Sequence, residues 1–449
     1  MLVKIGQKFE VWIRKALPDP LVIAIILTLI VGLLALALTP TTPIQVVENW
    51  SKGFWELISF TMQVAFGLIA GACLAQSPAV KRGMTRLCSI PKSAAGAVLM
   101  LSVTTLVLWF VNWGIGLIAG AFLAKETAVQ LSRKGAPYHL PLLAAGGYSG
   151  IITYEMGLTG AVPLWIAAAG HTFEADMGVV PLGETVFSSF NLLCFAGMLV
   201  LVPLCLILMS PKDKGKLIML DPAQVEEEEN RQEAGRTVRR RDTFAEKVEN
   251  MRLWSWFIAL LGLAFAVNHF VKNGFNVDLN IFNLIILCIG LAVWGYPLDY
   301  AASFKEQTSQ AWGVILQFPF YAGIMGIMTH SGLVPLIAKA FVQIASPQTM
   351  AAISFLSAGI VNFFVPSGGG QWAVQGPVMI EAAKILGVEL KTVAMAIGYG
   401  DAWTNLASPF WALPMAGVLG IKVRDFLGYS IVVTLVTGLF LGGMFLLTA

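Results

Sequence analysis

Charged side chains are scarce in this sequence. Its 449 residues are 57% hydrophobic and only 12% charged, whereas an average soluble protein carries about 25% charged residues. The scarcity is uneven, because 20 of the 55 charged residues lie within positions 211–252. The rest of the chain cannot cover a soluble globule with charge, which predicts a protein embedded in a lipid bilayer.

Other absences exclude whole classes of function. Four histidines are too few and too scattered for an obvious metal centre, and five cysteines without CxxC spacing form no zinc or disulfide framework. No GxxxxGK[ST] motif indicates ATP as an energy source. A net charge of +3 supplies no basic stripe, so we expect no nucleic-acid partner. We also expect no cofactor other than a coupling ion.

What the sequence does contain is a series of long apolar segments. A helix needs about 20 largely apolar residues to cross ~30 Å of hydrocarbon. The candidate segments are 20–40, 57–77, 93–124, 139–169, 184–209, 252–271, 279–297, 312–329, 350–385, 392–418 and 425–448. They predict an all-α polytopic membrane protein. We expect residues 1–19 to be a cytoplasmic or interfacial segment, and 210–251 to be a charged cytoplasmic linker and solvated spacer.

Four of these segments are interrupted by glycine, proline or polar residues at mid-depth. The interruptions recur at a nearly constant offset along the chain. Asn112 recurs as Asn362 at an offset of 250, and Gly147, Thr153 and Pro163 recur as Gly398, Thr404 and Pro414 at 251. Duplicated halves with interrupted helices in corresponding positions are typical of secondary transporters.

We therefore predict two inverted repeats, 20–209 and 279–449, joined by a connecting transmembrane helix, 252–271. Each repeat has a re-entrant hairpin (93–130 and 350–385) and a broken transmembrane helix (139–169 and 392–418), giving about 9 full crossings plus 2 hairpins. With a cytoplasmic N-terminus, the inner segments hold 24 Lys and Arg and the outer segments 5. This asymmetry agrees with the positive-inside rule.

The four interruptions predict one internal substrate site. Irregular backbone at membrane depth is tolerated only where protein or a water-filled cavity satisfies its polar groups. After Pro366, the glycines begin a helix whose free amides and dipole suit a carboxylate. No Lys or Arg lies in the interruptions, which favours a small substrate with one anionic end and a short apolar body. The predicted substrate-binding residues are Asn112, Trp113, Gly114, Asn362, Pro366, Ser367, Gly368, Gly369, Gly370, Gln371, Trp372 and Gln375.

Aromatic residues near the interruptions are expected to give this site an apolar lining. They are Trp109, Trp113, Trp372, Trp403, Trp411, Phe363 and Phe364. In membrane helices such aromatics more often serve packing or interfacial anchoring, so those that flank the hairpin tips are the stronger candidates.

Polar groups at the broken crossings predict the site of a coupling ion. Hydroxyls and amides suit Na⁺, which we expect near Thr153, Thr404 and Asn405, whereas Glu155 or Asp401 would carry a proton. Burying an ionisable group in a membrane costs at least ~2.5 kcal/mol, which favours a functional role. For Glu155, a structural contact beside an unwound turn is the alternative.

Several stretches of the sequence match a known family. They are Leu17–Leu21, Gly53-Phe54-Trp55, Asn112-Trp113-Gly114, Gln317–Ile324, Val365–Gly370, Gln375-Gly376-Pro377 and Phe410–Pro414. On these stretches the chain resembles the bacterial short-chain fatty acid transporter family (AtoE type) along essentially its whole length. The resemblance implies uptake of short-chain fatty acids or related small monocarboxylates, such as butyrate or acetoacetate, across a bacterial inner membrane.

The same resemblance implies a wider relationship to the ion-transporter superfamily of carboxylate carriers. It implies a homodimer with an elevator mechanism, in which the hairpins and broken helices move and spans such as 184–209 and 425–448 belong to a fixed scaffold. A carrier of another small carboxylate, a channel and an intramembrane enzyme are the alternatives. For an enzyme, Ser367 with His330 is the one pairing the sequence offers, and nothing orients the histidine.

Overall fold

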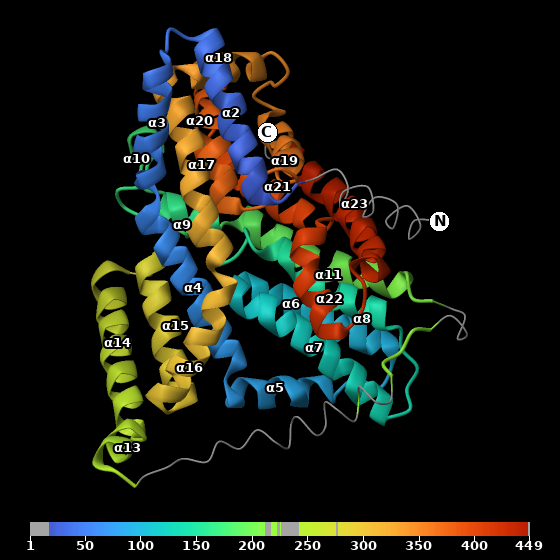
Figure 1. Cartoon of the computed structure of the whole chain (residues 1–449). Helices are drawn as coiled ribbons and strands as arrows, with labels where there is room; N and C mark the ends of the chain where they lie inside the picture. Colours follow the sequence, from blue (N-terminus) through green and yellow to red (C-terminus); the bar gives the residue numbers. More distant parts are fainter. Residues whose placement is uncertain (1–17, 212–216, 222–224, 226–241, 275–276, 448–449) are drawn as a thin grey trace.

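The computed structural model describes residues 18–211, 217–221, 225, 242–274 and 277–447 (Figure 1). Within these residues the regular structure is entirely helical, which confirms the predicted all-α class. Most of the predicted segment 1–19 and most of the charged linker 210–251 lie outside the described residues.

The first half contains α2 to α11. Their bounds are α2 Pro20–Leu38, α3 Pro43–Glu56, α4 Ile58–Gln76, α5 Pro78–Cys88, α6 Ala94–Val111, α7 Trp113–Arg133, α8 Leu140–Tyr148, the 3₁₀ helix η1 Ser149–Thr153, α9 Ala161–Ala167, α10 Glu174–Met177 and α11 Ser189–Leu208.

The connecting region and second half contain α13 to α23. Their bounds are α13 Phe244–Glu249, α14 Arg252–Asn273, α15 Leu279–Trp294, α16 Pro297–Gln307, the 3₁₀ helix η3 Thr308–Gln310, α17 Trp312–Ser331, α18 Leu333–Val342, α19 Met350–Val361, α20 Gly368–Leu386, α21 Leu390–Asn405, α22 Pro409–Leu419 and α23 Val423–Leu447.

Among the described residues, eight helices are long and apolar enough to cross a membrane. They are α2, the stacked pair α3–α4, α6, α7, α11, α14, α17 and α23. Shorter apolar helices complete the remaining predicted segments, including α15, α19 and α22. The two expected hairpins correspond to the pairs α6–α7 and α19–α20, and each pair is interrupted where the sequence predicts.

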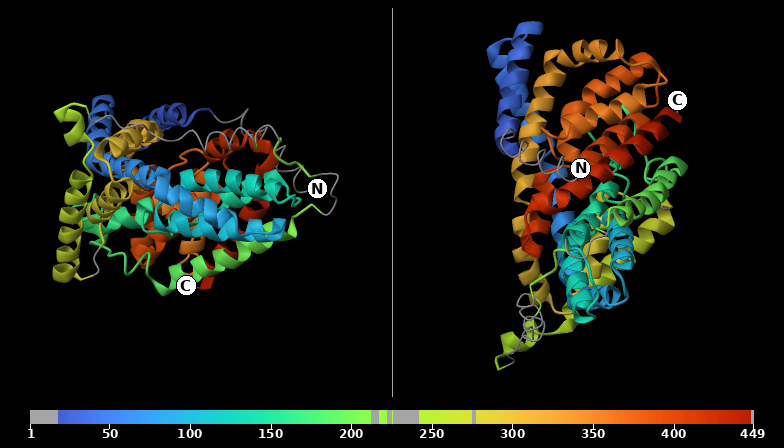
Figure 2. Two further views of the ribbon diagram at one scale, coloured as in Figure 1. Left: turned by 90° about the horizontal axis from the view of Figure 1, so that it is seen from below. Right: turned by 90° about the vertical axis from the view of Figure 1, so that its right-hand side faces the viewer.

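The two halves repeat the same packing. Helix α6 packs against α7 as α19 packs against α20, and α4 contacts α7 as α17 contacts α20. The long helices α11 and α23 lie against α6 and α19 in the same way. Because α11 and α23 pack on the hairpin arms (Figure 2), they belong structurally with the hairpins, although the sequence assigns them to the scaffold.

Matching threonines tie each broken helix to its hairpin. Thr153 donates to Leu106 O of α6 at 2.7 Å and to Gly150 O at 2.8 Å. In the second half, Thr404 donates to Gly359 O of α19 at 3.0 Å and to Gly400 O at 3.2 Å. Buried hydroxyls need such partners, so these hydrogen bonds explain why the threonine recurs at the repeat offset.

The second broken helix is interrupted later than the sequence predicts. In the predicted broken helix 392–418, the glycine-containing polar stretch 398–405 suggests the break, but it lies within the regular helix α21, and the interruption covers residues 406–408 instead. Pro409 has no N–H to continue the hydrogen-bond ladder, and it restricts Ser408 to extended backbone. The break in the first half is longer and covers η1 and the turns up to Gly160.

Short helices and part of the linker were not expected from the sequence. Helices α5 and α18 follow α4 and α17 in the two halves, and α3 extends the predicted span 57–77 towards the N-terminus. Residues 217–221 of the linker are docked, because Leu140 donates to Ile218 O at 2.7 Å and Leu220 N to the Tyr138 hydroxyl at 3.0 Å. The solvated-spacer prediction is therefore wrong for this stretch.

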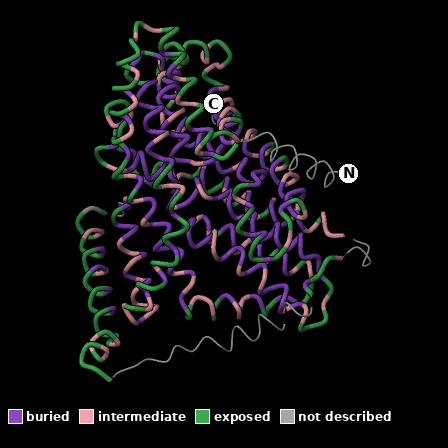
Figure 3. The backbone as a smooth tube through the Cα atoms, viewed as in Figure 1, coloured by how far each residue is buried: buried purple, intermediate pink, exposed green. Residues whose placement is uncertain are grey.

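Burial separates a packed centre from an apolar periphery. Buried residues gather around the hairpins and broken helices, whereas α14 at the edge is largely exposed (Figure 3). The exposed side chains there are apolar, such as Leu260 and Val271 on α14 and Leu29 and Leu33 on α2. Such surfaces suit contact with lipid. In Figure 1, α5, α13 and α16 lie at one end of the molecule and α10 and α18 at the other.

Candidate substrate and ion site

The first hairpin turns at a single residue, Asn112. Its backbone is extended, and its side-chain Oδ1 accepts from Ile115 N at 2.9 Å, which caps α7. The side chain is fully buried against α4, where an added Cβ at Gly71 would collide with it. Its amide Nδ2 has no hydrogen-bond partner. Neighbouring Gly114 lies against the Leu68 carbonyl of α4.

The second hairpin turns over six residues, Asn362–Ser367. Proline at 366 has no N–H to donate, and Ser367 caps the next helix by accepting from Gly370 N at 3.3 Å. The hydroxyl hydrogen of Ser367 has no acceptor in the described structure. This longer turn leaves a polar group and a helix N-terminus facing open space.

The three glycines form the first turn of α20, and close packing requires them. An added Cβ at Gly368 would collide with Glu155 Oε1, and one at Gly369 would lie 2.8 Å from Phe318 Cε2. At Gly370 the Cβ would collide with the Tyr321 ring. The glycines therefore allow α20 to approach α17 and the first-half broken helix.

Two adjoining cavities meet at this tip. The larger, about 450 Å³, extends from Pro366 and Ser367 to Ser309 and Gln310 of η3, which are exposed. The smaller, about 30 Å³, is lined by Ser367, Gly368 and Asp401. The larger volume suits a small organic molecule, and the smaller one exceeds the 10–15 Å³ or so that a water needs. Residues that line both cavities are Trp113, Val314, Phe318, Ser367 and Trp411.

Asp401 brings a charged group to the smaller cavity. It is fully buried in α21, and its Oδ2 accepts from Asn405 Nδ2 at 3.2 Å. Its Oδ1 has no hydrogen-bond partner. An unpaired buried carboxylate oxygen is expensive, so its presence indicates a ligand or a proton.

Asn362 holds the second hairpin to α21. Its Nδ2 lies 2.9 Å from the Asp401 carbonyl, 2.9 Å from Thr404 Oγ1 and 2.8 Å from Asn405 Oδ1. This cluster fixes the end of α21 against the turn. Asn362 is buried and lines neither cavity, and its own Oδ1 is unpartnered.

Glu155 occupies a different position from Asp401. It is fully buried between η1 and α9, and its two oxygens accept from Ala161 N at 3.1 Å and Val162 N at 3.0 Å. The carboxylate therefore satisfies the first amides of α9, as a helix N-terminus favours. It also lies against Gly368 and Gly398, so it joins three interrupted elements at one point. This geometry favours the structural alternative for Glu155.

The remaining predicted residues pack away from the cavities. Gln371 Nε2 donates to Ala358 O at 2.9 Å and to Gln375 Oε1 at 3.0 Å, which ties the two arms of the second hairpin. Trp372 packs edge-on against Phe173. The predicted site residues that line a cavity are Trp113, Pro366, Ser367, Gly368, Asp401 and Asn405. Those that do not are Asn112, Gly114, Thr153, Glu155, Asn362, Gly369, Gly370, Gln371, Trp372, Gln375 and Thr404.

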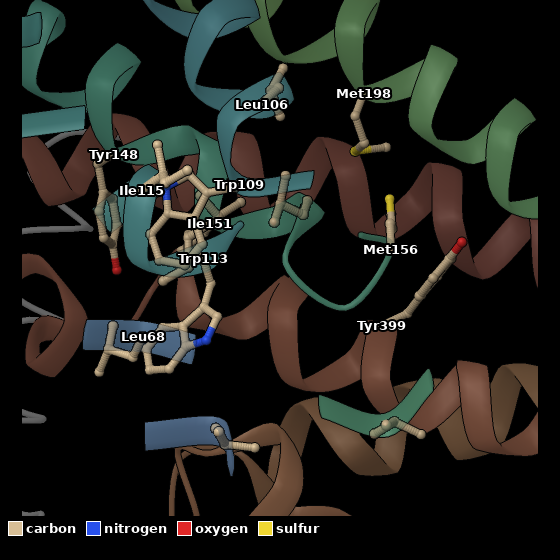
Figure 4. Packing of buried hydrophobic residues seen from close by; sticks show 14 of the residues in the cluster. Leu68, Leu106, Trp109, Trp113, Ile115, Tyr148, Ile151, Met156, Met198 and Tyr399 are labelled. Carbon is tan, nitrogen blue, oxygen red and sulfur yellow. The ribbon is translucent and has the colours of Figure 1, made fainter. Parts of the chain in front are cut away.

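Aromatic side chains make most of the apolar lining. Trp109 and Trp113, from the two arms of the first hairpin, lie near Ile151 (Figure 4), and all three line the smaller cavity. Trp411 lines both cavities and its Nε1 has no hydrogen-bond partner. By contrast, Trp403 Nε1 donates to Thr434 O at 2.6 Å, and the lining does not include Trp403, Phe363 or Phe364.

Sequence reasoning missed Phe318 as a lining residue. It lies on α17, lines both cavities and contacts Gly369. The available signal was Pro319, which lies inside α17 and marks a helix distorted beside the site. Gln317, one residue earlier, lines the larger cavity with an unpartnered Nε2.

The lining of the smaller cavity includes one acidic residue, Asp401. Neither cavity is lined by Lys, Arg or His among the described residues. The unpartnered groups are donors on Ser367, Trp411 and Gln317 and one acceptor, Asp401 Oδ1. No group of three or more His, Cys, Asp or Glu in this part of the chain is suitable for a metal ion. The site can therefore bind a small molecule with an apolar body and one polar end.

Comparison with solved structures identifies the fold. The chain resembles the YdaH transporter of Alcanivorax borkumensis, with a TM-score of 0.60 at 14% identity, covering 95% of this chain and 98% of that one. It also resembles MtrF of Neisseria gonorrhoeae, described as one of a class of antimetabolite efflux pumps, with a TM-score of 0.62 at 15% identity, covering 99% and 97%. The fold is that of a membrane transporter with paired, interrupted helices.

Sequence comparison identifies the family within that class. The profile of the short chain fatty acid transporter family matches residues 1–448. The "Putative short-chain fatty acid transporter" of Escherichia coli (strain K12) is 37% identical over 438 residues, 98% of each chain. A protein of the same name from Haemophilus influenzae is 35% identical over 455 residues, covering both chains completely. The chain belongs to the short-chain fatty acid transporter family, which confirms the resemblance described above.

Proposed function

We propose that this protein is a secondary active carrier for short-chain fatty acids or related small monocarboxylates, such as butyrate or acetoacetate. The observation that carries the proposal is the pair of adjoining cavities at the second hairpin tip. The larger cavity offers an apolar volume for a short acyl chain, and the smaller one offers polar groups on Ser367 and Asp401 for its carboxyl end. The names of the curated relatives support this substrate class.

The carrier would use an H⁺ or Na⁺ gradient in a bacterial inner membrane, with its N-terminus in the cytoplasm. Asp401 and Asn405 at the smaller cavity are the best placed residues for a coupling ion. Thr153 and Thr404 already donate to backbone carbonyls, so either would offer an ion only its remaining lone pairs. The larger cavity reaches η3, between the predicted spans 279–297 and 312–329, on the side that would be cytoplasmic if the N-terminus is cytoplasmic, and we infer an inward-open state.

An elevator mechanism in a homodimer is the mode of transport that we propose. The hairpins, the broken helices and the attached α11 and α23 form one packed unit. Helices α2, α3, α14, α15 and α16 gather around α4 and α17 and would form the scaffold. The hairpins would be re-entrant within the moving unit.

Uptake by reconstituted liposomes tests this function. Labelled C2 to C6 monocarboxylates are supplied with an inward H⁺ gradient, an inward Na⁺ gradient or neither. The proposal predicts uphill accumulation of one of these acids with one of the two gradients. Downhill equilibration that no gradient can drive uphill would instead indicate a channel. Absence of uptake, with conversion of the acid, would indicate an enzyme.

A further inference from the structure

The unpartnered oxygen of Asp401 indicates that the ligand of this site supplies a hydrogen-bond donor. Asp401 is fully buried, its Oδ2 is bonded to Asn405, and its Oδ1 has no donor within reach although it borders the smaller cavity. A buried acceptor without a donor is destabilising, and more so when the group is charged. A ligand that donates a hydrogen bond at this point would remove that penalty.

Within the described part of the chain, the surroundings of Asp401 provide no cation. Glu155 and Tyr154, from the segment between η1 and α9, face it, and neither becomes positive. Helices α9 and α19 have no titratable residue. On α20, the first titratable residue, Glu381, follows Gly368 by 13 residues, about 20 Å of helix. The charged residues of α23 are confined to its first turn.

A second negative charge is therefore unfavourable in this cavity. A substrate carboxylate beside Asp401 would bring two like charges together at low dielectric, with no Lys, Arg or His on the lining to offset them. Two carboxyl groups that share a site lower this energy by sharing one proton between them. The donors of the lining can serve the rest of the carboxyl group, because Trp411 Nε1–H has no partner and the Ser367 hydroxyl, whose oxygen accepts from Gly370 N, keeps its own hydrogen to donate.

We infer that this site binds its monocarboxylate as a carboxyl–carboxylate pair with Asp401, in which a single proton bridges the substrate oxygen and Asp401 Oδ1. The other substrate oxygen accepts from Trp411 Nε1–H or Ser367 Oγ–H, and the acyl chain extends past Phe318 into the larger cavity. One proton is present in the complex for each substrate anion, and no other bond changes. The inference rests on the proposed function and specifies its ligand chemistry and coupling ion.

A series of three related ligands tests the carboxyl–carboxylate pair in the unmodified protein. Purified full-length protein in nanodiscs is titrated with butyrate, butyramide and methyl butyrate at pH 6 and pH 9.5, in Na⁺ and in choline. We expect butyrate affinity to fall at least tenfold at the higher pH, because the shared proton is lost. Butyramide, which carries its own N–H donors, should bind equally at both values, and methyl butyrate, which has none, should not bind.

Asp401→Asn tests the same pairing from the protein side. An asparagine N–H can donate to butyrate itself, so the variant should bind butyrate with less than twofold difference between pH 6 and pH 9.5. Glu381→Gln on α20, which neutralises a carboxyl group away from both cavities, is the matched control and should keep the wild-type loss. If Asp401→Asn does not fold, the ligand series still decides.

The outcomes separate this inference from the function on which it rests. Butyrate binding with no pH dependence in the wild type would overturn the shared proton, as would restoration of affinity at pH 9.5 by Na⁺. Tight binding of methyl butyrate would also overturn it. In each of these cases butyrate still binds, and the carrier proposal stands. No binding or uptake of any C2 to C6 acid would overturn the proposed function itself.

Discussion

The first hairpin turns at one residue, Asn112, whereas the second turns over six, Asn362–Ser367. In the first, the side chain at the turn is fully enclosed against α4 and caps its own helix. In the second, Pro366 and Ser367 line an open cavity. The polar residue at the turn thus serves packing in the first half and lines a cavity in the second, although Trp113, next to Asn112, also lines both cavities.

The buried carboxylates differ in the same direction. Glu155, in the first half, has both oxygens bonded to the amides of α9. Asp401, in the second half, has one oxygen without a partner. A satisfied carboxylate stabilises a break in a helix, whereas an unsatisfied one can exchange protons or bind a ligand. The polar residues of the first-half turn and break are therefore structural, and those of the second half are available for binding, while the first half adds apolar lining such as Trp109 and Trp113. Matched substitutions test this difference.

The largest effect is expected from Gly368→Ala. Its Cβ would collide with Glu155 Oε1, so the second hairpin could not dock on the first-half broken helix. Overpacking of this kind destabilises by about 1–3 kcal/mol, and we expect a lower midpoint of thermal unfolding and loss of uptake. Gly417→Ala is the control, because an added Cβ there meets nothing within 4 Å. Equal stability of the two variants would contradict the close docking.

The threonine ties should respond in parallel in the two halves. Thr153→Val and Thr404→Val each remove one hydrogen bond to a hairpin carbonyl and one to a carbonyl of the broken helix, each worth about 0.5–1.5 kcal/mol. Thr404 also lies 2.9 Å from Asn362 Nδ2, so its variant should have the lower unfolding midpoint. If only one of the two substitutions lowered the unfolding midpoint, the two threonines would not be equivalent in the repeat.

Substitution of the two turn residues should separate them by their effect on binding, because each substitution also removes a helix cap. Ser367→Ala removes a hydroxyl from both cavities, and we expect about tenfold weaker butyrate binding, equivalent to ~1.4 kcal/mol. Asn112→Ala removes a helix cap, which costs about 1 kcal/mol of stability, with butyrate affinity changed less than twofold. Calorimetry and thermal unfolding measure both quantities. If Asn112→Ala weakens binding tenfold, the first turn binds substrate as its sequence predicts.

The smallest effect concerns the acyl chain. Leu117, from the first half, lines only the larger cavity. Leu117→Ala should favour hexanoate over butyrate by at least a few-fold, because hexanoate has two more methylenes and each is worth about 0.8 kcal/mol when buried. Competition between the two acids for uptake measures the ratio. An unchanged ratio would place the chain elsewhere in the cavity.

Much of the fold could be predicted from local signals. Asn112 and Pro366 interrupt apolar runs, and each lies at a hairpin tip in the structure. The sequence predicts the break in segment 392–418 too early, at 398–405, because glycines and polar residues there continue as helix when neighbouring helices pack closely against them and bond to them. The signal that decided the position was Pro409.

The site could be predicted only in part, because its contacts join distant segments. Sequence spacing gave Ser367 and Asp401 as site residues, and both line the smaller cavity. Sequence spacing could not reveal that the side chains of Gln371 and Thr404 donate hydrogen bonds that hold the second hairpin in place. Pro319 marks α17 as irregular, but an aromatic residue in an apolar span has no pattern of its own that would place Phe318 on the cavity lining.

The most direct measurement is substrate protection of a thiol at the second turn. The native cysteines are buried, apart from Cys205, which is partly exposed, so Ser367→Cys in a Cys205→Ser background adds one reactive position. We expect butyrate to slow the alkylation of this cysteine, with half-protection at the concentration that half-saturates binding. Hexanoate and butyramide should also slow it. Alkylation at the same rate with and without saturating butyrate would contradict the placement of the substrate at this turn.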